Sequence, residues 1–206
     1  MKSEIEQEFE TIIKNCFQTV LKPLGFKKKG NNFYRKLQDL GQIVNVQKSK
    51  FNSKEHISFT INTGLFIPEF WLIFYNYQGK SVPDYPTEPE CAIRQRIGKL
   101  KYNNLDKWFE IDNNSDFSKL NHDLNDSVVN FIIPYFEKTK TKNNIIQLLQ
   151  DKSVGLEKFT RLVIFGEYNE LIKAQQEYEN LKQDKYIFKN HKSTLKEYKE
   201  KYNLKD

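Results

Sequence analysis

The sequence contains only two cysteines, eight glycines and six prolines among its 206 residues. Cys16 and Cys91 lie far apart and form no Cys-x-x-Cys pair, so the sequence suggests neither a disulfide framework nor a zinc motif. Scarce glycine and proline favour regular helices and strands over long loops. We therefore expect reduced thiols, no metal and no cofactor.

Long hydrophobic runs are also missing. The longest hydrophobic segment extends from about Gly64 to Tyr77. It is broken by Pro68 and Glu69 and is too short to span a bilayer. The acidic N-terminal segment lacks the apolar stretch of a secretory signal. These features predict a cytoplasmic protein with no membrane association.

Charge of either sign is not concentrated in one tail. There are 33 Lys and Arg against 27 Asp and Glu, a net charge of +6. This excess is compatible with nucleic acid, with an acidic partner or with simple solubility. The 16 Phe and 11 Tyr supply enough large side chains for a folded core.

Three strand-like runs occupy the N-terminal third, after an amphipathic helix expected over residues 3–21. Ser3 and Glu6 form a capping-box pattern at the start of that helix. The runs cover residues 33–37, 42–51 and 57–65, separated by turn residues. Their period-two alternation predicts an antiparallel meander with one apolar face and one polar face.

The middle of the chain is less regular. Residues 67–90 contain four prolines and are expected to form an irregular excursion with one short strand or helix. Residues 90–97 and 107–111 are expected to be strands, the first ended by Gly98. A helix start signal at residues 113–116 precedes a helix that we expect to stop at Pro134.

From about residue 142 the pattern is helical and polar. The predicted fold class is therefore α+β, with an antiparallel sheet of about four to six strands packed by the N-terminal helix and a central helix. We expect an α+β domain over residues 1–137 and a helical C-terminal extension over residues 138–206.

A pair of arginines is the main candidate site. Arg94 and Arg96 lie two apart on a predicted strand, so both side chains emerge on one face. Two adjacent guanidinium groups can bind a phosphate or a carboxylate. A polar floor is expected beside them, formed by Asn45, Gln47, Ser58, Thr60 and Asn62. The alternative is that each arginine pairs with a neighbouring carboxylate.

A basic region around the first hairpin is a second candidate. It contains Lys27, Lys28, Lys29, Arg35, Lys48 and Lys50, interleaved with aromatic residues. Such a surface can hold a single-stranded nucleic acid. The alternative is a charged sheet edge that prevents aggregation.

No catalytic motif is recognisable in the sequence. Phosphate-binding loops, nucleophile elbows and zinc-protease motifs are all missing. Cys91 could act as a nucleophile with His56, but it shares the apolar register of Ile93 and is expected to be buried and inert. We assign no catalytic residue, and hydrolysis is the third hypothesis.

Three segments together resemble a bacterial family known as domain of unknown function 4304. They are KPLGFKKKGNNFYRK at residues 22–36, VNVQKSKFNS with FTINTG at residues 44–53 and 59–64, and ECAIRQRIGKL with KWFEI at residues 90–100 and 107–111. The resemblance covers about residues 5–136. It implies an α+β domain in a bacterial cytosolic protein and brings no established activity.

The leading functional hypothesis is a non-catalytic binding module. Its polar sheet face and two arginines would hold a partner protein or an anionic ligand. The alternative is a nucleic-acid-binding protein that uses the basic hairpin. The sequence does not indicate the identity of the partner or the oligomeric state.

Overall fold

The computed structural model describes residues 2–75, 79–152 and 154–205. These form two compact units. The sheet unit comprises Met1–Ile67 and Val82–Thr141, and the helical unit comprises Pro68–Ser81 and Lys142–Asp206. The α+β class and the antiparallel sheet are confirmed. Residues 68–81, which the sequence analysis placed in the first domain, group with the helical unit.

The sheet unit begins with the expected N-terminal helix. It consists of α1 (Glu4–Ile12), a π-helical turn (Ile13–Gln18), α2 (Thr19–Leu21) and a 3-10 turn (Lys22–Leu24). The capping box is present, because the Ser3 side chain accepts from the Glu6 N–H and Glu6 accepts from the Ser3 N–H. Gly25, at φ 88°, ends the helix in a left-handed conformation that suits glycine.

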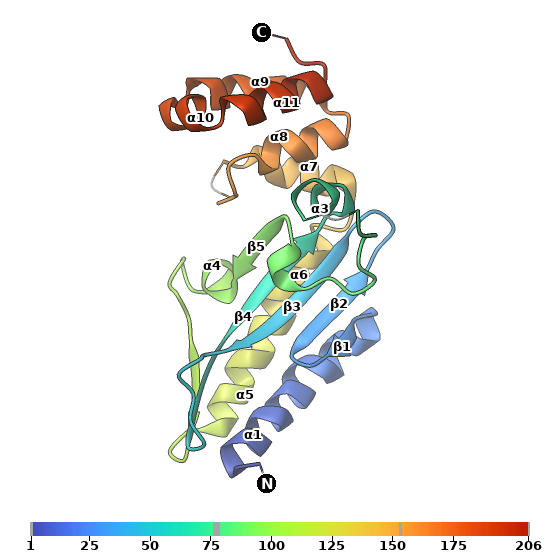
Figure 1. Cartoon of the computed structure of the whole chain (residues 1–206). Coiled ribbons are helices and arrows are strands. Elements are labelled where there is room, and N and C mark those ends of the chain that lie inside the picture. Colours follow the sequence, from blue (N-terminus) through green and yellow to red (C-terminus); the bar gives the residue numbers. More distant parts are fainter. Residues whose placement is uncertain (1, 76–78, 153, 206) are drawn as a thin grey trace. The chain divides into compact units, whose positions relative to one another are not determined.

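The sheet has six strands, all paired antiparallel (Figure 1). The order along the sheet is β1-β2-β3-β4-β5, and β6 pairs with the other end of β4. The strands are β1 (Lys27–Lys29), β2 (Asn32–Lys36), β3 (Gly41–Lys48), β4 (His56–Phe66), β5 (Ile93–Arg96) and β6 (Phe109–Asp112). The long strand β4 therefore pairs with three other strands, β3, β5 and β6.

Some predicted strand ends were wrong. The second run ends at Lys48 instead of residue 51, and Phe51 lies exposed in the turn. The strand predicted over residues 90–97 is limited to Ile93–Arg96, and Gly98 belongs to the short helix α4 (Ile97–Lys101). A Cβ atom at Gly98 would lie 1.7 Å from the Leu105 carbonyl oxygen, so glycine is needed there for close backbone approach and not to end a strand.

A second long helix covers the sheet beside the first. It comprises α5 (Phe117–Asp126), a π-helical turn (Ser127–Ile132) and α6 (Ile133–Glu137). Asp116 caps its start by accepting from the Lys119 N–H. The prediction that Pro134 stops this helix was wrong. Pro134 lies in the first turn of α6, directly after the π-helical turn, where a missing N–H is tolerated.

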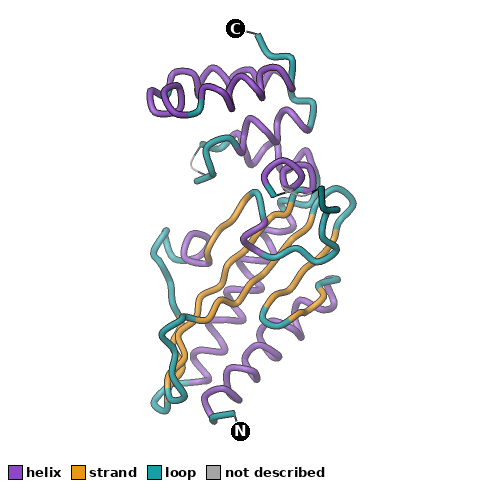
Figure 2. Tube along the Cα trace, viewed as in Figure 1, coloured by secondary structure: helices purple, strands orange, loops and turns teal. Residues whose placement is uncertain are grey.

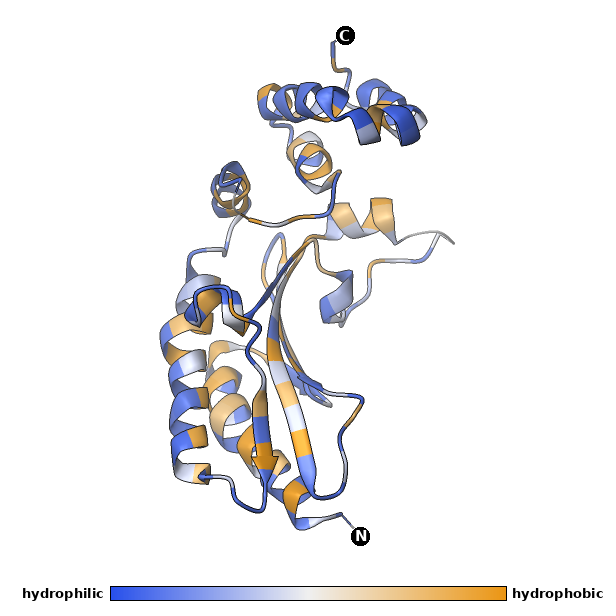
Figure 3. Cartoon of the chain, turned by 90° about the vertical axis from the view of Figure 1, so that its left-hand side faces the viewer, coloured by the Kyte–Doolittle hydropathy of each residue, from blue (hydrophilic) through white to orange (hydrophobic). Residues whose placement is uncertain are grey.

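Both long helices lie against the same face of the sheet. Phe9 of α1 packs edge-on against Phe59 of β4 at 5.3 Å, and Phe17 stacks on Phe33 of β2 at 6.1 Å. Figure 3 shows this layer with hydrophobic residues of the helices toward the strands and hydrophilic residues outward. We call this side of the sheet the helix-covered face and the opposite side the polar face.

The proline-rich excursion contains two described helical elements. They are α3 (Pro68–Phe74) and a 3-10 turn (Glu88–Glu90), while residues 76–78 lie outside the described part of the chain. Phe70 and Trp71 of α3 are buried. The Lys142 Nζ atom lies 2.8 Å from Glu69 Oε1, which ties α3 to the helical unit.

The described residues of the helical unit form helices and loops without strands (Figure 2). In addition to α3 these are α7 (Lys142–Gln150), α8 (Thr160–Glu167), α9 (Leu171–Gln183), α10 (Lys185–Asn190) and α11 (Lys192–Lys201). The Tyr202 ring packs so closely on Gly166 that a Cβ there would clash at 2.6 Å. Within the described residues, no helix has the length and apolar character needed to cross a membrane.

Candidate functional site

One row of polar side chains crosses five strands on the polar face. The strand register pairs Lys29 with Asn32, Asn32 with Asn45, Asn45 with Asn62, and Asn62 with Arg96. Residues directly opposite each other in antiparallel strands point to the same side of the sheet. We call these five residues the amide row. It has three asparagines in the middle and a cation at each end.

Hydrogen bonds connect the three asparagines. Asn45 Nδ2 donates to Asn32 Oδ1 at 2.8 Å, and Asn62 Nδ2 donates to Asn45 Oδ1 at 3.2 Å. Asn62 also donates to Gln47 Oε1 at 2.8 Å. Asn62 is 4% exposed, whereas Asn45 is half-buried and Gln47 is exposed. The row is therefore anchored at Asn62 and accessible from Asn45 and Gln47.

The sequence analysis predicted this shared face from alternation alone. Gln47 pairs with Thr60, and Arg94 pairs with Gly64, which lies on the same side of β4 as Asn62 and Thr60. The register therefore places all seven predicted residues on one side: Asn45, Gln47, Ser58, Thr60, Asn62, Arg94 and Arg96. Thr60 is fully buried and donates to the Lys107 carbonyl at 2.8 Å. Ser58 is half-buried, and its backbone is bonded to the Asn52 side chain. These two residues are part of the sheet's internal bonding.

Arg94 forms a bidentate ion pair with a buried carboxylate. Its Nε lies 2.8 Å from Glu88 Oε1, and its Nη2 lies 3.1 Å from Glu88 Oε2. Glu88 is 5% exposed, so this guanidinium neutralises a charge that has little contact with water. A new anion at Arg94 would have to compete with that carboxylate.

Arg96 is in a different environment. Its Nη1 lies 2.7 Å from Asp106 Oδ1, and both side chains are exposed. The guanidinium also lies over the Trp108 ring at 5.6 Å, and Trp108 Nε1 donates to Asp106 Oδ2 at 3.1 Å. The adjacent guanidinium and the indole N–H lower the pKa of the Asp106 carboxyl. Arg96, Asp106 and Trp108 therefore form one accessible cluster.

The opposite end of the row has a similar arrangement. The Lys29 ammonium lies 5.9 Å from the centre of the Tyr85 ring. The Tyr85 hydroxyl lies 2.9 and 2.8 Å from the Lys27 and Asn32 carbonyl oxygens, which share its single donor hydrogen. A half-buried aromatic ring with a cation above it therefore lies at each end of the amide row.

The predicted basic patch is divided between the two faces. Lys27 and Lys29 share the polar face, because they pair with Tyr34 and Asn32. Lys28 pairs with Phe33, and Lys48 pairs with Phe59, so both are on the helix-covered side. Lys50 lies beyond β3, over the exposed Phe51 ring. The lysines of this region therefore do not form one continuous surface.

Arg35, the last member of that patch, is largely buried on the helix-covered face. It donates to Gln42 Oε1 and to the Leu24 carbonyl, and its Nη2 lies 3.4 Å from Glu137 Oε1. Gln42 is fully buried and donates to the Phe136 carbonyl at 2.8 Å. This network satisfies carbonyl groups at two helix ends and attaches them to the sheet. Arg35 is therefore a structural residue.

The two cysteines are both buried. Cys91 Sγ lies against Gly64, near one end of β4, whereas His56 begins the other end of that strand. Gly64 is eight positions along the strand from His56, a span of roughly 26 Å. Burial raises the pKa of the Cys91 thiol well above its ordinary value and that of Cys16 to about 11. Cys91 and His56 therefore do not form a catalytic pair.

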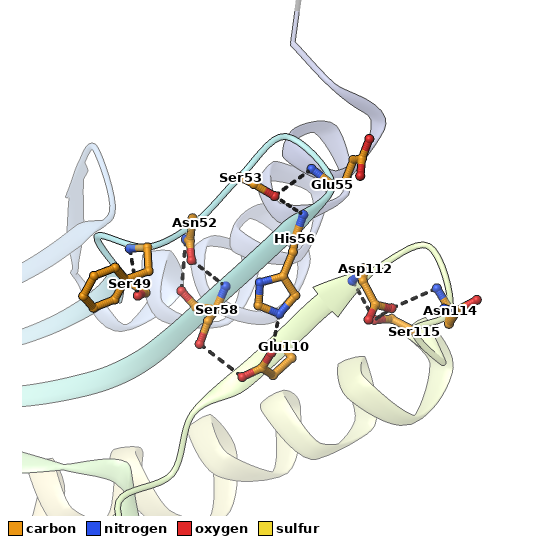
Figure 4. A network of polar contacts seen from close by, with 11 residues as sticks. Ser49, Asn52, Ser53, Glu55, His56, Ser58, Glu110, Asp112, Asn114 and Ser115 are labelled. Carbon is orange, nitrogen blue, oxygen red and sulfur yellow. Dashed lines mark hydrogen bonds and ion pairs between the residues drawn. The ribbon is translucent and has the colours of Figure 1, made fainter.

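His56 takes part in a separate polar network at the far end of β4 and β6 (Figure 4). His56 Nε2 contacts Glu110 Oε2, and Ser58 Oγ donates to Glu110 Oε1 at 3.4 Å. The carboxylate thus lies between the imidazole and the hydroxyl. This order differs from a catalytic triad, in which the imidazole contacts the hydroxyl directly. The described part of the chain also contains no group of three or more His, Cys, Asp or Glu arranged to hold a metal.

Several residues of the site were not recognised in the sequence. Asn32 lies one residue before the strand expected over residues 33–37, and Tyr85 and Trp108 had no assigned role. The alternative that each arginine pairs with a neighbouring carboxylate describes Arg94, but Glu88 was not named as its partner. Only tertiary contacts place Tyr85 beneath Lys29 and Glu88 beneath Arg94. The alternation that identified Asn45 would have identified Asn32 if the strand had been started one residue earlier.

Comparisons with known proteins give one match. No curated protein matches the chain, and no solved structure matches it. A family model matches residues 17–138, which include all six strands, the whole second long helix and the end of the first. The chain therefore belongs to the family described as Domain of unknown function (DUF4304).

Proposed function

We propose that this protein is a non-catalytic binding module that holds a partner protein on the polar face of its sheet. The amide row is the observation that carries the proposal. Five polar side chains from five strands line up on the side opposite the two long helices. With neighbouring strands about 4.8 Å apart, the row spans roughly 19 Å.

The chemistry of the row suits a polypeptide. Each side-chain amide has two donor hydrogens and a carbonyl oxygen with two lone pairs. The bonds among Asn32, Asn45 and Asn62 use only part of that capacity. The remaining donors and acceptors can pair with backbone N–H and C=O groups, which a partner protein presents in equal numbers.

The two ends of the row supply the residue types that dominate binding energy in protein interfaces. Arg96 with Trp108 lies at one end, and Tyr85 with Lys29 lies at the other. Tryptophan, tyrosine and arginine are enriched among residues whose truncation weakens protein complexes most. The exposed Arg96–Asp106 pair provides one charge of each sign for a partner to match.

The environment of Arg94 favours a protein over a small anion. The earlier hypothesis used Arg94 and Arg96 together to grip a phosphate or carboxylate. Removing Arg94 from Glu88 would leave a nearly buried carboxylate without its cation, which is costly. The accessible polar groups are therefore the amides and the Arg96 cluster. The division of the basic lysines between two faces gives the nucleic-acid alternative less support.

The proposal is tested by comparative capture from a lysate of the source organism. Tagged wild-type protein is compared with Gln47→Arg and Arg96→Glu, which alter exposed groups on the polar face. Ser118→Arg on the exposed side of α5 is the matched control. Quantitative mass spectrometry should show one protein enriched by the wild type and the control, and reduced at least fivefold by both face variants.

Retention of the same protein by both face variants would reject the polar face as the binding surface. Purified wild-type protein should also be titrated with a 20-nucleotide single strand at increasing salt. Tight binding that weakens steeply with salt would replace the proposal with the nucleic-acid alternative.

A further inference from the structure

The helical unit contains a groove whose charged lining is entirely lysine. It lies among α9, α10 and α11, which run close together at the C-terminal end of the chain (Figure 1), and it has a volume of about 310 Å³. Tyr178, Phe188 and Leu195 form its apolar surface. Lys182, Lys192, Lys196 and Lys199 line it as well. We call this feature the basic groove.

The apolar part of the basic groove comes from three different helices. Tyr178 of α9 and Leu195 of α11 are almost fully buried and hold the helices together. Phe188 of α10 is 48% exposed. Because it lies in a concave surface, the exposed part of the Phe188 ring offers apolar area that a ligand can bury.

Two of the four lysines form ion pairs within their own helices, and both pairs are weak. Lys182 and Lys196 contact glutamates of their own helices at 3.5 and 3.7 Å, and the Lys196 pair is strongly exposed. Such solvent-exposed pairs are weak. Among the described residues that line the groove the charged side chains are lysines, and no carboxylate lies in the lining itself.

From this combination we propose that the basic groove binds an acidic amphipathic helix of a partner protein. Apolar side chains on one side of that helix would contact Phe188 and Leu195, and flanking Asp or Glu residues would pair with the lysines. A helix laid in a groove uses apolar residues at three- and four-residue spacing in this way. The site is separate from the polar face of the sheet and goes beyond the function proposed above.

The ring contacts favour a helix over a single-stranded nucleic acid. Base stacking needs a free aromatic face. The Lys182 ammonium lies over the Tyr178 ring at 5.4 Å, and the Lys192 ammonium lies over the Phe188 ring at 5.5 Å. Carboxylates can pair with these ammonium groups while apolar side chains contact the rim of Phe188.

The test is a fluorescence-anisotropy titration with two synthetic 16-residue amphipathic helices. Both carry leucine at the same three- and four-residue spacing, and their flanking positions are all glutamate in one and all lysine in the other. The full-length protein should bind the glutamate peptide at least tenfold more tightly than the lysine peptide. Its affinity should fall several-fold between 50 and 300 mM salt.

Matched variants locate the binding site. Lys192→Glu with Lys196→Glu should weaken glutamate-peptide binding at least tenfold. Lys185→Glu with Lys189→Glu, which makes the same charge change on exposed positions outside the groove lining, should weaken it less than threefold. Phe188→Ala should weaken it about tenfold with an unchanged salt dependence, since it removes apolar contact only. Circular dichroism checks that every variant is folded.

Three results would overturn the proposal. They are equal binding of both peptides, equal effects of the two charge-reversal pairs, and tighter binding of a 15-nucleotide oligouridylate or of anionic lipid vesicles with the same variant dependence. Arg96→Glu should leave peptide binding unchanged, so this test is independent of the function proposed for the sheet.

Discussion

Phe59 and Thr60 are neighbours in β4 and both are fully buried, yet they lie on opposite faces of the sheet and make different interactions. Phe59 packs between Phe9 and Phe109, at 5.3 and 5.5 Å. Thr60 donates one directed hydrogen bond to the Lys107 carbonyl. At this point of β4 the helix-covered face is thus held by packing of aromatic rings and the polar face by a hydrogen bond.

This difference affects what each face can do. Apolar burial is non-directional and scales with area, so the helix-covered face contributes most of the stability. A hydrogen-bonded face contributes less net stability, because its groups also bond to water when unfolded. The accessible groups of such a face can exchange some of their bonds for those of a partner at little cost. Because the two faces contribute differently to stability, mutations on them should also affect folding to different extents.

The largest effect is expected on the helix-covered face. Phe59→Ala should lower the free energy of unfolding by about 3–5 kcal/mol, because it removes a fully buried ring and leaves a cavity. Gln47→Ala on the polar face should change it by less than about 0.5 kcal/mol. Urea denaturation measures both, and similar losses for the two variants would contradict the comparison.

The two arginines of the polar face should differ in how much they contribute to the free energy of unfolding. Arg94→Ala should destabilise the protein by about 2 kcal/mol, since it leaves the Glu88 carboxylate buried without its cation. Arg96→Ala breaks an exposed pair and should cost less than about 0.5 kcal/mol. Adding Glu88→Gln to Arg94→Ala should restore part of the lost stability. Equal losses of stability for Arg94→Ala and Arg96→Ala would show that burial of Glu88 does not make the loss of Arg94 more costly.

Loss of the central amide should have a smaller effect. Asn45→Ala removes the bonds to Asn32 and Asn62 and should lower the free energy of unfolding by about 1 kcal/mol. Asn62 keeps its bond to Gln47 in this variant. Combining Asn45→Ala with Gln47→Ala should therefore cost more than the sum of the single changes. Simple additivity in thermal unfolding would argue against a connected row.

The smallest effect concerns the thiols, which should have no influence near neutral pH. Burial raises the pKa of Cys16 from 9.0 to about 11, so the folded protein keeps a proton that the unfolded chain releases. Stability is then unaffected below about pH 9 and falls as the pH rises from 9 toward 11. Cys16→Ala should flatten this alkaline decline relative to wild type. An unchanged slope would show that other groups cause it.

Much of the fold was predictable because it follows local patterns. The capping box at Ser3, the alternation along β4 and the start signal before α5 were each recognised and are present. The end of the central helix was not, because proline normally interrupts a helix and the π-helical turn that accommodates Pro134 leaves no clear pattern. The short helix at Ile97 was missed because Ile97 continues the strand alternation.

The amino-acid sequence by itself determined the class of the fold and which side chains share the polar face, since period-two alternation fixes the side of every strand residue. Only the tertiary structure decided how those side chains are used. It pairs Arg94 with a buried Glu88, places Trp108 beneath Arg96 and divides the basic hairpin between two faces. These contacts depend on strand register and chain crossings over long sequence separations, which no local pattern specifies.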